Sequence, residues 1–237
     1  MTHAINRLVF ISYSYGDEKR IASLAAHLRQ TIGVRPEKAF PIVDVLEFQI
    51  CDLWKNFRFV VNLDSNFDPL VLATAKFDPP EIVVRESVYQ HAVIDSRPAR
   101  VVLAHELGHF WLRHGRKSLK EAQLEAEYLE WQADEFAAEL LMPSGIASRM
   151  APDEIAGQFK VPPQTAKVRL ETLEARRKIS SADGVPRYEP FMGLLSRFER
   201  ELLYWAPASL AAYPLDQISS PSQPSAPPPR TAAAARA

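Results

Sequence analysis

The chain has 237 residues, of which 47% are apolar and 24% are charged, a balance typical of a folded globular protein rather than a disordered or fibrous one. Its 28 basic and 29 acidic residues give a net charge of -1, which excludes a globally cationic nucleic-acid binder. Cys51 is the only cysteine, so an internal disulfide, a cysteine-based zinc finger and an iron–sulfur cluster are excluded. No run approaches the ~18 apolar residues that span a bilayer, and the first apolar run is too short for a secretory signal. We therefore expect a cytoplasmic protein without a membrane partner.

The first half of the chain predicts one helix and several short strands. Arg7–Tyr13 is a short apolar run typical of a strand, and Lys19–Gln30 has apolar residues at helical spacing. Three later runs are rich in β-branched and aromatic residues and are bounded by turn residues, which predicts strands at Phe57–Leu63, Pro69–Ala75 and Glu81–Tyr89.

The second half predicts helices. Capping and stop signals place one helix at Arg97–His114, and Ser118–Glu121 has the form of a capping box ahead of a long helix that Pro143 closes. Two helices joined by a proline-containing turn are expected within Ala151–Lys178, and another helix at Pro190–Trp205. Strands followed by helices favour an α+β fold, with a small mixed or antiparallel sheet packed on a helical core.

The strongest chemical signal is His105-Glu106-Leu107-Gly108-His109, which falls inside a predicted helix. Histidines four residues apart lie on one helix face, so both imidazoles can bind one metal ion, for which zinc is the natural choice. Glu106 is rotated by ~100° from His105. It would therefore reach a metal-bound water, which is where the general base of a hydrolase must be.

A catalytic zinc site usually needs a third protein ligand. Glu130 is the leading candidate, and Asp134 lies one helical turn later, where it can accept the outer N–H of a ligating histidine. Spacing alone leaves other acids of this helix in competition: Glu125, Glu127, Glu135 and Glu139. His114 lies about 140° around the helix from His109. We therefore predict that it is not a ligand and instead complements the dipole at the helix C-terminus.

Two blocks of sequence resemble the ImmA/IrrE family of metallo-endopeptidases, which are gluzincin-like zinc proteases. They are Ala104–His109 and Glu130–Pro143, and weaker similarity extends the match to about Ile21–Leu173. In this family the glutamate that opens the second block is the third zinc ligand. The resemblance therefore implies a zinc ion held by His105, His109 and Glu130, with Glu106 as the catalytic base.

The resemblance also implies a domain organisation. A zincin-like metallopeptidase domain is expected at residues 1–148, and a helix-turn-helix-like unit at 149–180. A C-terminal helical segment would follow at 181–219, and residues 220–237 are a Pro/Ala-rich segment that we expect to be disordered. The second helix of the helix-turn-helix-like unit carries five basic residues, Lys167, Arg169, Arg176, Arg177 and Lys178. Because Glu171 and Glu174 dilute this charge, we favour a structural or substrate-docking role over DNA binding.

The function implied by the resemblance is zinc-dependent hydrolysis of a peptide bond in a protein substrate. The expected substrate is a helix-turn-helix transcriptional repressor or an antitoxin-like regulator, supplied as a separate chain. An extended substrate is expected to add as a strand beside Glu81–Arg85. The alternative is a non-catalytic, zinc-containing regulator that acts by binding a repressor or DNA.

Overall fold

The computed structural model describes residues 18–114 and 122–180, with side chains left out at 122–127 and 179–180. All of these residues belong to one compact unit, residues 1–204. Four predictions lie outside the described residues: the strand at Arg7–Tyr13, the capping box at Ser118–Glu121, the helix at Pro190–Trp205 and the disordered tail at 220–237.

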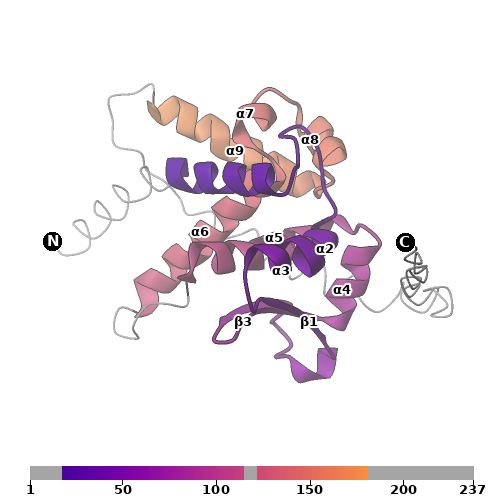
Figure 1. The fold of residues 1–237 in the computed structure, drawn as a ribbon. Coiled ribbons are helices and arrows are strands. Elements are labelled where there is room, and N and C mark those ends of the chain that lie inside the picture. Colours follow the sequence, from indigo (N-terminus) through magenta and orange to yellow (C-terminus); the bar gives the residue numbers. More distant parts are fainter. Residues whose placement is uncertain (1–17, 115–121, 181–237) are drawn as a thin grey trace, which may run out of the picture. The chain divides into compact units, whose positions relative to one another are not determined.

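The described residues are mostly helical and contain one small sheet, which confirms the α+β class (Figure 1). After a helix at residues 18–31, the elements follow in this order: α2 Ile42–Asp44, η1 Val45–Gln49, α3 Ile50–Leu53, β1 Arg58–Asn62, η2 Asp64–Asn66, β2 Ala73–Phe77, β3 Pro80–Arg85, α4 Glu86–Val93, α5 Arg97–Leu112, α6 Ala122–Leu141, α7 Ser144–Ala147, α8 Pro152–Phe159 and α9 Pro163–Ser180. None of these helices is both long and apolar enough to cross a lipid bilayer.

The sheet has the strand order β1-β3-β2, with β1 parallel and β2 antiparallel to β3. Strand β3 is central, and its Ile82, Val83 and Val84 are buried. Because β3 is hydrogen-bonded on both sides, it offers no free edge. The expected strand addition beside Glu81–Arg85 is therefore wrong, and among the described strands β2 and β1 form the edges.

Two strand predictions were wrong in their extent. The strand expected at Pro69–Ala75 begins only at Ala73, because residues 69–70 form a turn. The run Glu81–Tyr89 changes from strand to helix at Glu86, where α4 begins. Glu86 lies in the first turn of α4, where an acidic side chain is favourable for the helix dipole. The helical segment at 42–53 was not predicted, because its Ile42, Val43 and Val45 have low intrinsic helix propensity.

Helix α5 lies at the centre of the fold, between the sheet and the other long helices (Figure 1). On the sheet side, the ring of Phe110 lies 4.6 Å from Trp54, 4.7 Å from Phe57 and 6.3 Å from Phe77, measured between ring centroids. These rings connect α5 with β2 and with the segment between α3 and β1. On its other side α5 packs against α6, so that α5 holds a fixed place between the two.

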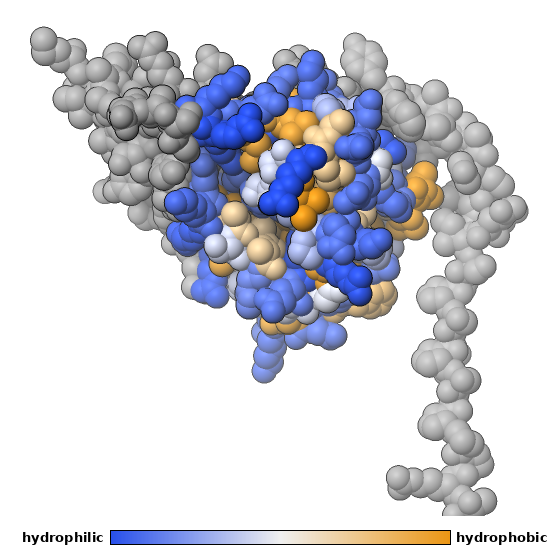
Figure 2. Space-filling model, turned by 90° about the horizontal axis from the view of Figure 1, so that it is seen from above, coloured by the Kyte–Doolittle hydropathy of each residue, from blue (hydrophilic) through white to orange (hydrophobic). Residues whose placement is uncertain are grey.

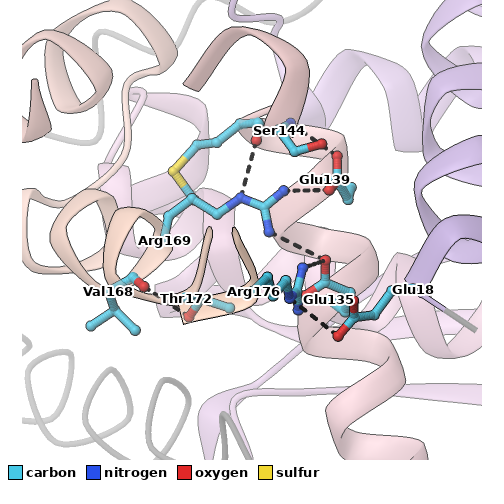
Figure 3. Close-up of polar contacts among 9 residues, drawn as sticks. Glu18, Glu135, Glu139, Ser144, Val168, Arg169, Thr172 and Arg176 are labelled. Atoms are coloured by element: carbon cyan, nitrogen blue, oxygen red, sulfur yellow. Dashed lines mark hydrogen bonds and ion pairs between the residues drawn. The ribbon is translucent and has the colours of Figure 1, made fainter. Parts of the chain in front are cut away.

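Helices α8 and α9 are joined by a short turn at residues 160–162, as predicted, although a helix-turn-helix role remains a prediction. Figure 2 looks down on the side of the molecule where α7, α8 and α9 lie in Figure 1, and the coloured surface there is mostly hydrophilic with small separate apolar patches. Helix α9 is tied to α6 by buried ion pairs, in which Arg169 lies 3.2 Å from Glu135 and 2.5 Å from Glu139 (Figure 3).

Candidate metal centre

The structure brings His105, His109 and Glu130 together at one point between α5 and α6. The Nε2 atoms of the two histidines are 2.9 Å apart. Each carboxylate oxygen of Glu130 lies 3.3 Å from one of these nitrogens, Oε2 from His105 and Oε1 from His109. One ligand atom from each residue lies within 4.8 Å of the others, a grouping that could hold a single metal ion.

The donor set fits a divalent transition metal. Two imidazole nitrogens and one carboxylate oxygen form the set of protein ligands that leaves a catalytic zinc site with an open position. The side chain of Glu130 is 52% exposed, whereas that of His105 is 3% exposed. Solvent therefore reaches the carboxylate side of the site, while the histidine side is enclosed by protein.

The competing acids on α6 that the structure describes do not reach this point. Glu135 and Glu139 are buried on another face of the helix, where they pair with Arg169. The side chains of Glu125 and Glu127 lie outside the described residues. Among the described acids, Glu130 is the one grouped with the two histidines.

A glycine makes the close approach of α5 and α6 feasible. A Cβ atom placed on Gly108 would lie 2.9 Å from the backbone oxygen of Ala133 and 3.3 Å from the ring of Phe136. The first of these distances is shorter than real Cβ contacts, and a backbone atom cannot move aside without shifting its helix. Gly108 thus lets α6 bring Glu130 and Asp134 within reach of the histidines.

The outer nitrogen of His105 is held by Asp134, as the spacing on α6 led us to expect. Its Nδ1 lies 2.8 Å from Oδ1 of Asp134, which is buried. Burial disfavours a charged imidazole, but hydrogen bonding to Asp134 and Glu130 outweighs this effect and raises the pKa of His105 to about 10. Burial would raise the pKa of Glu130, but hydrogen bonds from both histidines outweigh it and lower this pKa. Glu130 is therefore ionised at neutral pH, as a metal ligand must be.

His114 has a place in the site that the sequence analysis missed. Its Nδ1 lies 2.8 Å from Nδ1 of His109, and its Nε2 lies 3.1 Å from Oε1 of Gln132. The expected role in complementing the helix dipole does not describe these contacts. The predicted rotation of about 140° holds only for a helix that continues through residue 114. Helix α5 instead ends at Leu112, and Arg113 adopts a left-handed conformation with φ 61°. The turn at Arg113 brings His114 back over His109.

The candidate centre opens into a cavity of about 340 Å³. Glu106 lines this cavity together with the three candidate ligands, so the predicted base faces the same space as the predicted metal. Another part of the cavity wall comes from β2 and the loop before it. That wall is largely apolar and consists of Leu70, Val71, Leu72, Ala73, Thr74, Ala75 and Phe77.

Comparison with known proteins gives one family match. Residues 85–171 match the peptidase family described as the IrrE N-terminal-like domain. This stretch begins at Arg85, the last residue of β3, and includes all of α5 and α6 and each residue of the candidate centre. A comparison with curated proteins gives no match. This match over residues 85–171 supports the predicted resemblance to the ImmA/IrrE metallopeptidases.

Proposed function

We propose that the chain is a zinc-dependent endopeptidase. The observation that carries this proposal is the convergence of two Nε2 atoms and one carboxylate on the wall of a cavity that Glu106 also lines. A site built only for structure would normally close the metal with four protein ligands. Here the described residues offer three, and the carboxylate side is exposed to solvent.

His105, His109 and Glu130 would hold the metal. When bound, zinc supplies a Lewis acid for the scissile carbonyl and lowers the pKa of a bound water to about 7. Glu106 accepts the proton of the attacking water at its carboxylate and then donates it to the leaving amine. Asp134 keeps the ring of His105 oriented through the bond at Nδ1.

The cavity wall suggests how a peptide is held. Among the described residues β2 has a strand partner on one side only, and Ala73, Thr74 and Ala75 line the cavity beside the candidate metal ligands. An extended peptide that pairs with the free edge of β2 would run along this wall. We infer that the substrate binds at β2 in place of the edge first expected at β3.

The identity of the substrate rests on the family resemblance. We propose a helix-turn-helix repressor or an antitoxin-like regulator, supplied as a separate chain. Direct DNA binding through α9 is less favoured, because Arg169 is fully buried and Arg176 is largely buried against Glu135 and Glu18. Lys167 lies 4.0 Å from Glu171 on the same helix, which further reduces the cationic surface that α9 can offer to phosphates.

The decisive experiment compares the wild-type chain with Glu106→Gln. Each is co-expressed with the product of the neighbouring gene as the candidate regulator, and the resulting proteins are analysed by mass spectrometry. We expect cleavage of the regulator by the wild type and none by Glu106→Gln, with equal zinc content in the two proteins. Full activity in the variant would remove Glu106 from the mechanism. Stoichiometric binding of the regulator without any cleaved product would favour the alternative, a non-catalytic zinc-containing regulator.

A further inference from the structure

The two candidate histidine ligands are supported in different ways. His105 is backed by a carboxylate, because its Nδ1 lies 2.8 Å from Asp134. His109 is backed by a second imidazole, since its Nδ1 lies 2.8 Å from Nδ1 of His114. The far nitrogen of His114 lies 3.1 Å from the amide oxygen of Gln132. The hydrogen-bonded series His109–His114–Gln132 therefore connects a candidate ligand on α5 with the neighbouring helix α6.

The proton positions in this hydrogen-bonded series follow from the geometry. His109 faces His105 and Glu130 with its Nε2, so a ring that binds a cation there carries its single proton on Nδ1. This N–H donates to Nδ1 of His114, which must then present a lone pair. The proton of a neutral His114 lies on Nε2, where it donates to Oε1 of Gln132. An amide oxygen only accepts a hydrogen bond, so both hydrogen bonds are donated in the same direction, from His109 to His114 and from His114 to Gln132.

We propose that His114 and Gln132 form a positioning relay that fixes His109 in the tautomer and orientation needed to bind a divalent cation. His114 does not belong to the grouped metal-ligand residues, and Gln132 contacts His114, so both act through His109. The proposal rests on the metal-binding part of the proposed function and not on its peptidase step. The relay also orients His109 without adding another carboxylate beside Glu106, Glu130 and Asp134.

The backbone supports the same assignment. The turn at Arg113, with φ 61° and ψ 44°, ends α5 and brings His114 over His109. Left-handed conformations are uncommon for residues other than glycine. Arg113 is held there by hydrogen bonds from its N–H to the carbonyls of His109 and Phe110, and its guanidinium lies 5.2 Å from the ring of Trp54. This conformation delivers the acceptor nitrogen to the outer edge of the ligand ring.

The first test uses two variants of nearly equal shape, His114→Asn and His114→Leu, in the full chain. The Oδ1 of asparagine can take the place of Nδ1 of histidine as an acceptor, whereas leucine offers no acceptor. The Zn²⁺ dissociation constant is measured by competition with a chromophoric chelator. We expect a loss of affinity of about 10–100-fold for His114→Leu, as is usual when the hydrogen-bond partner of a ligand is removed, and retention to within a few-fold for His114→Asn. A role in packing alone predicts that leucine is tolerated at least as well as asparagine, which would overturn the relay.

A second pair of variants tests the far end of the relay. Gln132→Leu removes the acceptor for the Nε2–H of His114. The proton of His114 can then move to Nδ1, where it faces the Nδ1–H of His109 and the hydrogen bond between the two rings is lost. The matched control is Gln158→Leu on α8, away from the site, which removes a glutamine whose amide donates to the backbone carbonyl of Glu37. We expect weaker Zn²⁺ binding and an altered Co²⁺ absorption spectrum for Gln132→Leu, and neither change for the control. Equal affinities in both variants would overturn the relay, whereas absence of Zn²⁺ binding by the wild type would remove the metal site itself.

Discussion

Helix α6 carries two pairs of acids at the same four-residue spacing, and the two pairs have different partners. Glu130 and Asp134 face the imidazoles of α5, within 3.3 Å and 2.8 Å of His105. Glu135 and Glu139 face the guanidinium of Arg169 on α9, at 3.2 Å and 2.5 Å (Figure 3). A shift of five residues along the helix, about 140° of rotation, separates the two faces.

The two pairs also differ in their access to solvent. The Glu130 side chain is 52% exposed, whereas that of Glu135 is 2% exposed. Burial raises the pKa of Glu135, but Arg169 and Arg176 outweigh it and lower this pKa. The charges of Glu130 and Asp134 are therefore accessible to an exchangeable cation. Those of Glu135 and Glu139 are neutralised by guanidinium groups of the protein itself. Glu135 and Glu139 thus link α6 to α9, while Glu130 and Asp134 lie on the face of the same helix that meets the histidines.

The largest expected effect comes from removing the guanidinium. Arg169→Met leaves Glu139 buried without its guanidinium partner and leaves Glu135 with Arg176 alone. Breaking a buried ion pair in this way costs about 3–5 kcal/mol of unfolding free energy. Urea unfolding of the metal-free chain measures the loss. The control is Lys167→Met on the exposed face of the same helix, where the pair with Glu171 should contribute at most about 1 kcal/mol. A loss for Arg169→Met no larger than that of the control would show that the buried pair does not fasten α6.

The same substitution on each face sharpens the comparison. Glu130→Gln removes the charge of a candidate ligand, so Zn²⁺ affinity should fall by more than about 100-fold, beyond the usual effect of losing a partner of a ligand. The stability of the metal-free chain should change little, because Glu130 is half exposed. Glu135→Gln should do the opposite and lower the unfolding free energy by about 1–3 kcal/mol. Chelator competition and urea unfolding on both variants give the four values. Unchanged zinc content in Glu130→Gln would move the third ligand to another acid.

The sequence predicted the local pieces of this arrangement better than their contacts. The histidine spacing placed both imidazoles on one face of α5, and the spacing of Glu130 and Asp134 placed both acids on one face of α6. Local periodicity fixes such relations within a helix. Which face of α6 meets α5 depends on packing between segments far apart in the sequence. For that reason the sequence left Glu135 and Glu139 as alternatives to Glu130 for the third ligand. Their actual partner, Arg169, lies 34 residues from Glu135 in the sequence.

The errors have physical causes of the same kind. The first part of Glu81–Tyr89 is rich in β-branched residues. Its change from strand to helix at Glu86 depends on packing of Val88 and Ala92 that no local pattern reveals. His114 was expected to face away from the histidine pair because the helix was assumed to continue through residue 114. A single left-handed residue, Arg113, instead ends the helix before it. Gly108 lies inside the HELGH motif, and the need for a glycine there becomes clear only from the backbone of Ala133 that it meets.

The pH dependence of metal affinity gives the smallest effect and the finest test of the first acid pair. Burial disfavours charge on His105, but Asp134 and Glu130 outweigh it and raise its pKa to about 10. At neutral pH the metal-free ring therefore carries a proton on the nitrogen that a cation must occupy, and binding releases this proton. Affinity should rise by about tenfold per pH unit for each proton released, and His105 alone supplies one between pH 6.5 and 8.

Asp134→Asn separates this effect from other titrations. The substitution removes the carboxylate that stabilises the charged form of His105. The pKa of His105 therefore falls, and fewer protons are released on metal binding over the same pH range. Its pH slope should be shallower than that of the wild type, even though its affinity is lower at each pH because the ring is less firmly oriented. Zn²⁺ dissociation constants at several pH values in a non-coordinating buffer give both slopes. Parallel slopes would mean that the proton released on binding does not come from His105, and that Asp134 supports the ring by orientation alone.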